Sequence, residues 1–313
     1  MAYRKQSPGG LSPAARITQE IIARLEAGTK PWIQPWRGVP VSRPLRACGI
    51  PYRGMNVFWL WMVADMCGYA SPYWMTYNQA KSLGAQVRKG EKSTIAIFCK
   101  SYTKEVEAQE TGEKSDEARR VLKAYPVFNA DQVEGLPERF HPAASLELVE
   151  PEGREAELDA FFGKVPVNLR YQGSEAYYEP LADRVTMPPA HLFSGFDHHY
   201  ATLAHELSHW TGHSSRLARD LRNRFGTAAY AAEELIAELS SAMLGAELGL
   251  PVAHLDHHAS YIGHWLKLLR DDDRAILTAA AKAEEASGLL LRLGGRAVPE
   301  EAASAAGDTA LAA

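Results

Sequence analysis

The sequence contains little cysteine and no long apolar run. Its three cysteines, Cys48, Cys67 and Cys99, are too few for a disulfide framework, and they lack the C-x-x-C spacing of a metal knuckle. No apolar stretch approaches the roughly 18 residues of a membrane-spanning helix, and the opening MAYRKQSPGG lacks the apolar segment of a signal peptide. We therefore expect a soluble, cytoplasmic protein in a reducing compartment.

Net charge is also low, at −4 over 313 residues, but this value hides an uneven distribution. Residues 1–130 carry a net charge of +9 and the remainder carries −13, with 15 basic and only four acidic residues before Glu105. Such asymmetry indicates that the first half meets a polyanion, although two domains with different surface composition would also produce it. A hydrophobic content of 46% excludes a disordered chain.

Apolar periodicity and chain-breaking residues predict an α+β protein of two domains. We place a first domain at 1–135, a linker rich in Pro, Glu and Gly at 136–154, a second domain at 155–292 and a disordered tail at 293–313. The expected helices cover 14–27, 56–66, 76–82, 155–162, 199–211, 228–248, 253–269 and 274–291. The expected strands cover 94–98, 124–128, 168–178 and 183–187, with the polar residues 104–120 as an exposed hairpin tip.

The segment His205-Glu206-Leu207-Ser208-His209 is an H-E-x-x-H motif within a predicted helix. Positions four apart lie on one helix face, so both imidazoles can reach one zinc ion. Zinc lowers the pKa of a water molecule that it binds. Glu206 would face this water and act as its general base. These spacings predict a metal site with His205 and His209 as ligands.

A hydrolytic zinc site needs a third protein ligand and an open position. Glu234 and Glu238 share one face of the helix predicted downstream. One carboxylate can bind the metal while the other accepts a hydrogen bond from the free N–H of a ligand histidine. Glu233 points away from this face and is interpreted as a solvated charge. In the metzincin pattern the third ligand would fall at Ser215, so His213 could replace it only through a sharp turn.

The short strand predicted at 183–187 precedes the motif helix. It is either an edge strand that pairs with an extended substrate or a strand of the core.

Tryptophan and basic residues alternate in the first half. Single-stranded nucleic acid binds where cations follow the phosphates and aromatic rings stack on bases, whereas duplex readers carry a recognisable helix motif, which is not evident here. Phe58, Trp59 and Trp61 fit a hydrophobic core better. The candidate DNA-binding residues in loop-like or turn-like sequence are Lys30, Trp32, Trp36, Arg37, Arg46, Arg53, Arg88 and Lys89.

Several motifs together resemble ArdC-type plasmid antirestriction proteins, whose N-terminal part is similar to that of TraC-type primases. The motifs are PWIQPW (31–36), YRGMNV (52–57), WMTYNQA (74–80), VRKGEK (87–92), VFNADQ (127–132), HELSHWTGH (205–213) and EELIAEL (233–239). The resemblance implies an N-terminal single-stranded-DNA-binding domain, a C-terminal zincin-like metallopeptidase domain and protection of incoming conjugative DNA from restriction.

The segment E-x-x-A-E, Glu234 to Glu238, also resembles that of gluzincin peptidases, in which the first acidic residue is the ligand. That resemblance assigns Glu234 to zinc, or another divalent metal such as manganese, and Glu238 to a supporting role or to an alternative ligand position.

Two functions remain open at this stage. In one, the protein is a DNA-binding protective factor whose metal domain stabilises the fold or docks a restriction protein. In the other, it is a DNA-tethered zinc protease that cleaves a host protein. A primase or nuclease is disfavoured because the basic half has no acidic metal cluster in its sequence.

Overall fold

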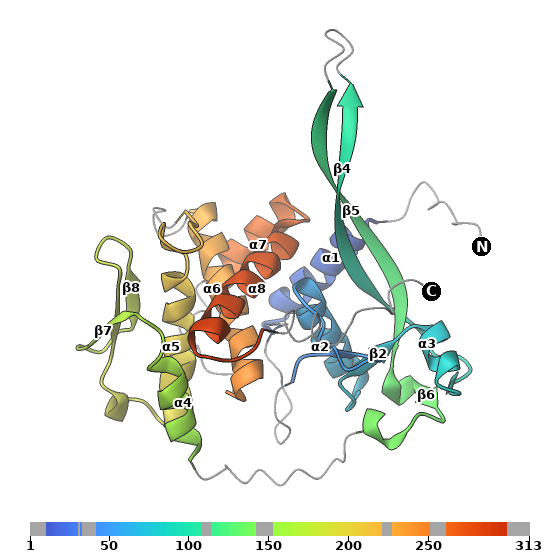
Figure 1. Cartoon of the computed structure of the whole chain (residues 1–313), viewed down its shortest axis with the longest axis horizontal. Coiled ribbons are helices and arrows are strands. Elements are labelled where there is room, and N and C mark those ends of the chain that lie inside the picture. Colours follow the sequence, from blue (N-terminus) through green and yellow to red (C-terminus); the bar gives the residue numbers. More distant parts are fainter. Residues whose placement is uncertain are drawn as a thin grey trace.

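A computed structural model describes residues 11–30, 32, 42–107, 114–141, 153–220, 227–250 and 261–298. The protein is α+β, with a strand-rich N-terminal part and a mainly helical C-terminal part (Figure 1). Within the described residues, no helix combines the length and apolarity needed to cross a membrane.

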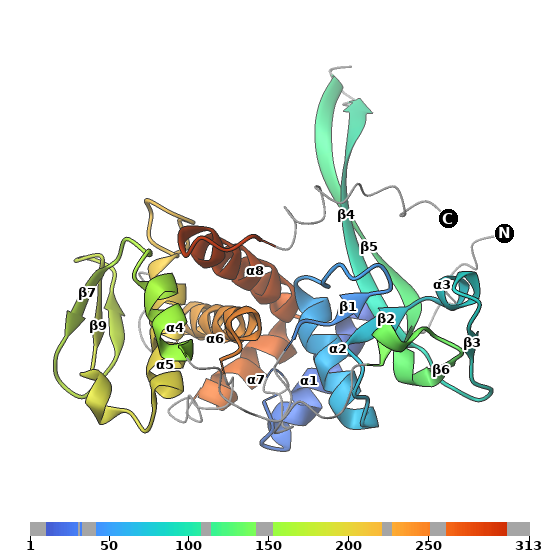
Figure 2. The ribbon, with the colours of Figure 1, turned by 60° about the horizontal axis from the view of Figure 1, so that its bottom comes forward.

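The N-terminal part is organised around a four-stranded sheet of order β1-β2-β5-β4. Its strands are β1 (Leu45–Arg46), β2 (Tyr73–Met75), β4 (Thr94–Glu107) and β5 (Lys114–Asn129); β3 (Gln86–Val87) and β6 (Val133–Glu134) form a separate pair. Strands β4 and β5 make a long hairpin that projects from the molecule (Figures 1 and 2).

The hairpin strands are much longer than the sequence predicted, because most of residues 104–120 belong to the ladder and not to the tip. The register places Lys104 opposite Glu117 and Glu107 opposite Lys114. Backbone hydrogen bonds between the strands hold such a ladder together even where few of its side chains are apolar. A criterion based on apolar residues therefore ended both strands too early.

Three helices accompany this sheet: α1 (Pro13–Glu26), α2 (Met55–Cys67) and α3 (Tyr77–Ser82). Helix α2 covers the free edge of β4 through side-chain hydrogen bonds. The Asn56 amide donates to the carbonyl of Ile97 at 2.7 Å and accepts from its N–H at 2.8 Å, and the Trp59 indole donates to the carbonyl of Ile95. Because these backbone groups are paired, this first part of the β4 edge is closed to another strand.

The C-terminal part comprises helices α4 (Arg154–Phe162), α5 (Phe196–Trp210), α6 (Ala228–Leu248), α7 (Ile262–Asp271) and α8 (Ala275–Leu293). Helix α6 has the predicted bounds. Residues 251–260, where helix α7 was expected to begin, lie outside the described residues.

A sheet of order β7-β9-β8 lies beside these helices, formed by β7 (Asn168–Tyr171), β8 (Tyr177–Glu179) and β9 (Arg184–Met187). One expectation is wrong here, and one open alternative is decided. The single strand predicted at 168–178 is two strands, separated where Gly173 adopts a positive φ of 69°. Of the two alternatives for residues 183–187, the structure has the core strand, because β9 pairs with both neighbours and buries Val185 and Met187. The edge strand that contacts α5 is β8.

One hydrophobic cluster joins the two parts of the chain. It contains residues of α1 and α2 together with residues of α6, α7 and α8. The rings of Trp32 and Trp265 meet edge to face at 5.4 Å, and buried Arg43 donates two hydrogen bonds to Glu284. The two parts therefore share a core, although each also has a smaller cluster of its own.

The ends of the predicted linker and the start of the predicted tail are packed. Phe140, inside the expected linker, is fully buried against the N-terminal part. Val298, inside the expected tail, is 4% exposed and packs in the C-terminal cluster. Residues 142–152 and 299–313 lie outside the described residues.

Candidate metal centre and nucleic-acid interface

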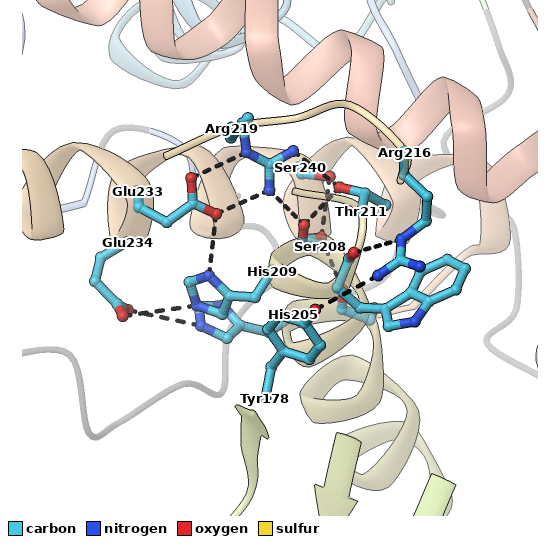
Figure 3. A network of polar contacts seen from close by, with 12 residues as sticks. Tyr178, His205, Ser208, His209, Thr211, Arg216, Arg219, Glu233, Glu234 and Ser240 are labelled. Atoms are coloured by element: carbon cyan, nitrogen blue, oxygen red, sulfur yellow. Dashed lines mark hydrogen bonds and ion pairs between the residues drawn. The ribbon is translucent and has the colours of Figure 1, made fainter. Parts of the chain in front are cut away.

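Helix α5 presents His205 and His209 on one face, as their spacing predicts (Figure 3). The helix is held by buried Leu203 and Leu207 on its core side. The two imidazole rings lie with their centroids 4.9 Å apart at 82°. Both Nε2 atoms face the same carboxylate on α6.

Glu234 on α6 faces the two histidines. Its carboxylate oxygens lie 3.8 Å from Nε2 of His205 and 3.6 Å from Nε2 of His209, and one ligand atom from each residue falls within 4.8 Å of the others. A hydrogen bond between such atoms spans about 2.7–3.2 Å. Two atoms each about 2.1 Å from one metal at a tetrahedral angle lie about 3.4 Å apart. Two imidazoles and a carboxylate at these separations fit a metal ion better than direct hydrogen bonds.

Glu206 lies beside this group and is only 8% exposed. Burial raises the pKa of its carboxyl to about 7, and the nearby Glu234 carboxylate acts in the same direction; His209 and a backbone hydrogen bond from Tyr178 oppose the shift. Tyr178 belongs to the edge strand β8, so the strand that contacts α5 also contacts the candidate base. A carboxyl with a pKa near neutrality can both accept and return a proton.

Glu233 is buried, which corrects its interpretation as a solvated charge. Its carboxylate lies 3.2 Å from Nδ1 of His209 and accepts two hydrogen bonds from the Arg219 guanidinium, at 2.8 and 2.9 Å (Figure 3). Arg219 also donates to the Ser208 carbonyl and to the Thr211 hydroxyl. Glu233 thus occupies the supporting position expected of Glu238, because α6 turns this side of its surface toward α5.

Glu238 faces the N-terminal part instead. Its carboxylate lies 3.2 Å from Nζ of Lys30, and both side chains are largely buried. Burial raises the pKa of the Glu238 carboxyl to about 7, while Lys30 acts to lower it. Among the described residues, the group able to hold a metal comprises His205, His209 and Glu234 and omits Glu238.

Two phenols border the ligand group. Tyr230, one helical turn before Glu234 on α6, hydrogen-bonds to the Glu234 carboxylate, and its hydroxyl lies 3.1 Å from that of Tyr261.

His213 belongs to a turn after α5, where its Nδ1 lies 2.8 Å from the Ser215 hydroxyl. It is absent from the ligand group.

The predicted DNA-binding residues have diverse surroundings. Trp32 is 1% exposed in the shared core, so its ring is not available to a base, and Lys30 is engaged with Glu238. The sequence had assigned both to DNA because their segment lacks apolar periodicity. Trp36 and Arg37 lie outside the described residues.

Four predicted cations remain at or near the surface. The Arg46 guanidinium lies 5.8 Å from the centre of the Tyr52 ring. The Arg53 side chain is 38% exposed and lies 3.5 Å from Glu284. Arg88 pairs with Glu91 at 2.7 Å, and Lys89 is exposed next to it.

Comparisons with known proteins match both parts. Residues 12–128 match the model of the N-terminal domain of anti-restriction factor ArdC, and residues 156–282 match a zincin-like metallopeptidase model. The metal-free crystal structure of antirestriction ArdC protein from the R388 plasmid is 44% identical, with a TM-score of 0.76 over 91% of this chain and 98% of that one. The chain belongs to the ArdC family of antirestriction proteins.

Further relatives of this ArdC-family chain include a metal-bound structure. The Mn(II)-bound form of the R388 protein is 42% identical, with a TM-score of 0.75 over 91% of this chain and 99% of that one. An uncharacterised protein, y4eC, of Sinorhizobium fredii (strain NBRC 101917 / NGR234) is 39% identical over 86% of this chain and 88% of its own length. DNA primase TraC of Escherichia coli is 37% identical over 91% of this chain, which covers 28% of that primase.

Sequence reasoning missed several residues of the candidate metal centre in this ArdC-family protein. Arg219 lies in a loop ten residues after His209, and no motif marks it. Tyr178 contributes a backbone group, which carries no side-chain signal. Only Glu233 had a usable signal, because it neighbours Glu234 on a helix and a carboxylate commonly orients a ligand histidine.

Proposed function

We propose that this ArdC-family protein binds single-stranded DNA, holds a divalent metal at His205, His209 and Glu234, and protects incoming plasmid DNA from host restriction during conjugation. The observation that carries the metal assignment is the approach of three ligand atoms to within 4.8 Å of one another. The Mn(II)-bound ArdC relative supports a divalent metal, either zinc or manganese. The expected location of this activity is the cytoplasm.

The same residues support hydrolytic chemistry at that centre. A bound divalent metal would act as a Lewis acid. Glu206 would then take a proton from an attacking water at its carboxylate and return it to a leaving amine, and its pKa of about 7 supports both steps. Glu233 accepts from Nδ1 of His209 and so keeps Nε2 of that ring directed at the ligand group.

The second candidate function is a DNA-tethered metalloprotease that cleaves a host protein. It is favoured by the burial of Glu206 beside the ligand group, since a purely structural metal would need no general base there. Under this alternative, DNA binding serves only to bring the protease to its target.

The substitution Glu206→Gln separates the two functions, with Glu285→Gln, an exposed position on α8, as the matched control. Metal content of the purified protein is measured first, and protection is then scored in a restriction-challenge assay. Unchanged metal content with unchanged protection supports the DNA-binding factor; unchanged metal content with lost protection supports the protease. Loss of metal from His205→Ala but not from the control tests the ligand assignment.

Single-stranded DNA binding rests on the ArdC N-terminal model and on the similarity to TraC primases. The charge of +9 in residues 1–130 supports it as well. We expect binding that weakens with salt and that favours single strands over duplex. Equal affinity for both forms in a gel-shift assay would contradict this part of the proposal.

A further inference from the structure

The base of the β4–β5 hairpin carries two exposed aromatic side chains on one face. Phe98 is 40% exposed and Tyr125 is 37% exposed. The register pairs Ala96 with Tyr125 and Phe98 with Lys123, so these four residues share one face of the two-stranded ladder. Phe98 and Tyr125 are diagonal neighbours there, at a spacing that aromatic side chains can bridge.

This face continues toward β1. Tyr125 and Arg46 lie close enough to Tyr52 to influence its hydroxyl electrostatically, and Arg46 lies over the Tyr52 ring. Lys123 is exposed beside Phe98 in the ladder. Aromatic rings and cations from two distant segments of the chain are thus gathered at one place.

Charge along the hairpin distinguishes its base from its tip. Residues 94–104 and 118–130 contain no acidic residue, and they contain five basic ones: Lys100, Lys104, Arg119, Arg120 and Lys123. The acidic residues of the hairpin sequence all lie between 105 and 117. Among the described side chains, the exposed cation Lys123 lies beside the exposed rings. Single-stranded nucleic acid complements both, because its phosphates are anionic and its unpaired bases offer flat apolar faces.

We infer that Phe98 and Tyr125 form a base-stacking platform for single-stranded DNA, with Lys123 and Arg46 contacting its phosphates. This inference rests on the proposed function and moves the stacking role from Trp32, which is buried, to the hairpin. A duplex does not fit this role, because its bases are stacked on one another and expose no face to the two rings.

The test measures affinity for a fluorescent oligonucleotide of a single base type with full-length variants. Phe98→Leu and Tyr125→Leu keep apolar bulk while removing the ring, and Phe98→Trp keeps a ring. Tyr77→Leu is the matched control, because Tyr77 is 46% exposed on α3 in the same part of the chain. Lys123→Ala tests the phosphate contact.

Each leucine variant is expected to bind at least about fivefold more weakly than the wild type, as the loss of one base stack predicts. Phe98→Trp and Tyr77→Leu should bind like the wild type. In Lys123→Ala, the slope of log affinity against log salt should become shallower by about 0.7, the value for one phosphate contact on a single strand.

Two failures are distinguishable. If the wild type does not bind single strands, the proposed function falls, and the platform falls with it. If the wild type binds and both leucine variants match Tyr77→Leu, with circular dichroism showing that all are folded, only the platform is overturned.

Discussion

The ammonium group of Lys30 lies 3.2 Å from the carboxylate of Glu238, in a pair that joins the N-terminal part to the helix carrying Glu234. Both side chains are largely buried, at 12% and 6% exposure. The basic half of the sequence therefore contributes a charge next to the candidate metal centre, and the pair becomes sensitive to the loss of either partner.

Replacing Lys30 with Met leaves Glu238 buried without its cationic partner. We expect the free energy of unfolding to fall by roughly 3–5 kcal/mol, the usual effect of removing one member of a buried pair. Urea denaturation measures it. Adding Glu238→Gln to Lys30→Met should recover part of the lost free energy of unfolding. A double variant whose loss equals the sum of the losses in the two single variants would contradict a direct pairing.

Replacing Glu233 with Ala removes the carboxylate that faces Nδ1 of His209. Metal affinity should fall by about 10- to 100-fold, because this contact orients the ring and increases its basicity. Competition with a chelating dye measures the affinity. Glu285→Ala on the exposed face of α8 is the control, and an equal affinity in the two variants would exclude the supporting role of Glu233.

Metal uptake should depend on pH through His209. Burial alone disfavours the charged ring, but the Glu234 and Glu233 carboxylates outweigh it and raise the pKa of His209 in the metal-free protein to about 9. A ligand histidine must be neutral, so binding below that pKa releases a proton. Apparent affinity should rise between about pH 6 and pH 9. Calorimetry in two buffers of different ionisation enthalpy measures the released proton. Equal observed binding enthalpies in the two buffers would contradict proton release.

Replacing Trp265 with Ala removes a fully buried ring that contacts Trp32 and donates a hydrogen bond to the Ala231 carbonyl. The loss should be about 3–5 kcal/mol. Since the ring lies in the core common to both parts, single-stranded DNA binding and metal binding should be lost together at one lower urea concentration. Two separate transitions would show that the parts unfold independently.

Local sequence determined much of the candidate site. The spacing of His205 and His209 fixes a common face on any helix, and Thr227 and Gly249 bound helix α6 because the first caps its N-terminus and the second adopts the left-handed conformation at its end. Such features depend on residues a few positions apart. They follow from covalent geometry and hydrogen bonding within one element.

Tertiary structure alone decided which neighbour each carboxylate of α6 meets. The sequence places Glu234 and Glu238 on one helix face. In the structure, however, Glu233 contacts His209, and Glu238 forms an ion pair with Lys30. Both contacts depend on how α6 is rotated against α5 and on where the N-terminal part packs, which the whole core determines. The same packing buries Trp32, which has no periodic signal, and leaves Phe98 and Tyr125 exposed on their strands. Contacts between segments over 200 residues apart depend on the assembled core, so local sequence patterns do not predict them.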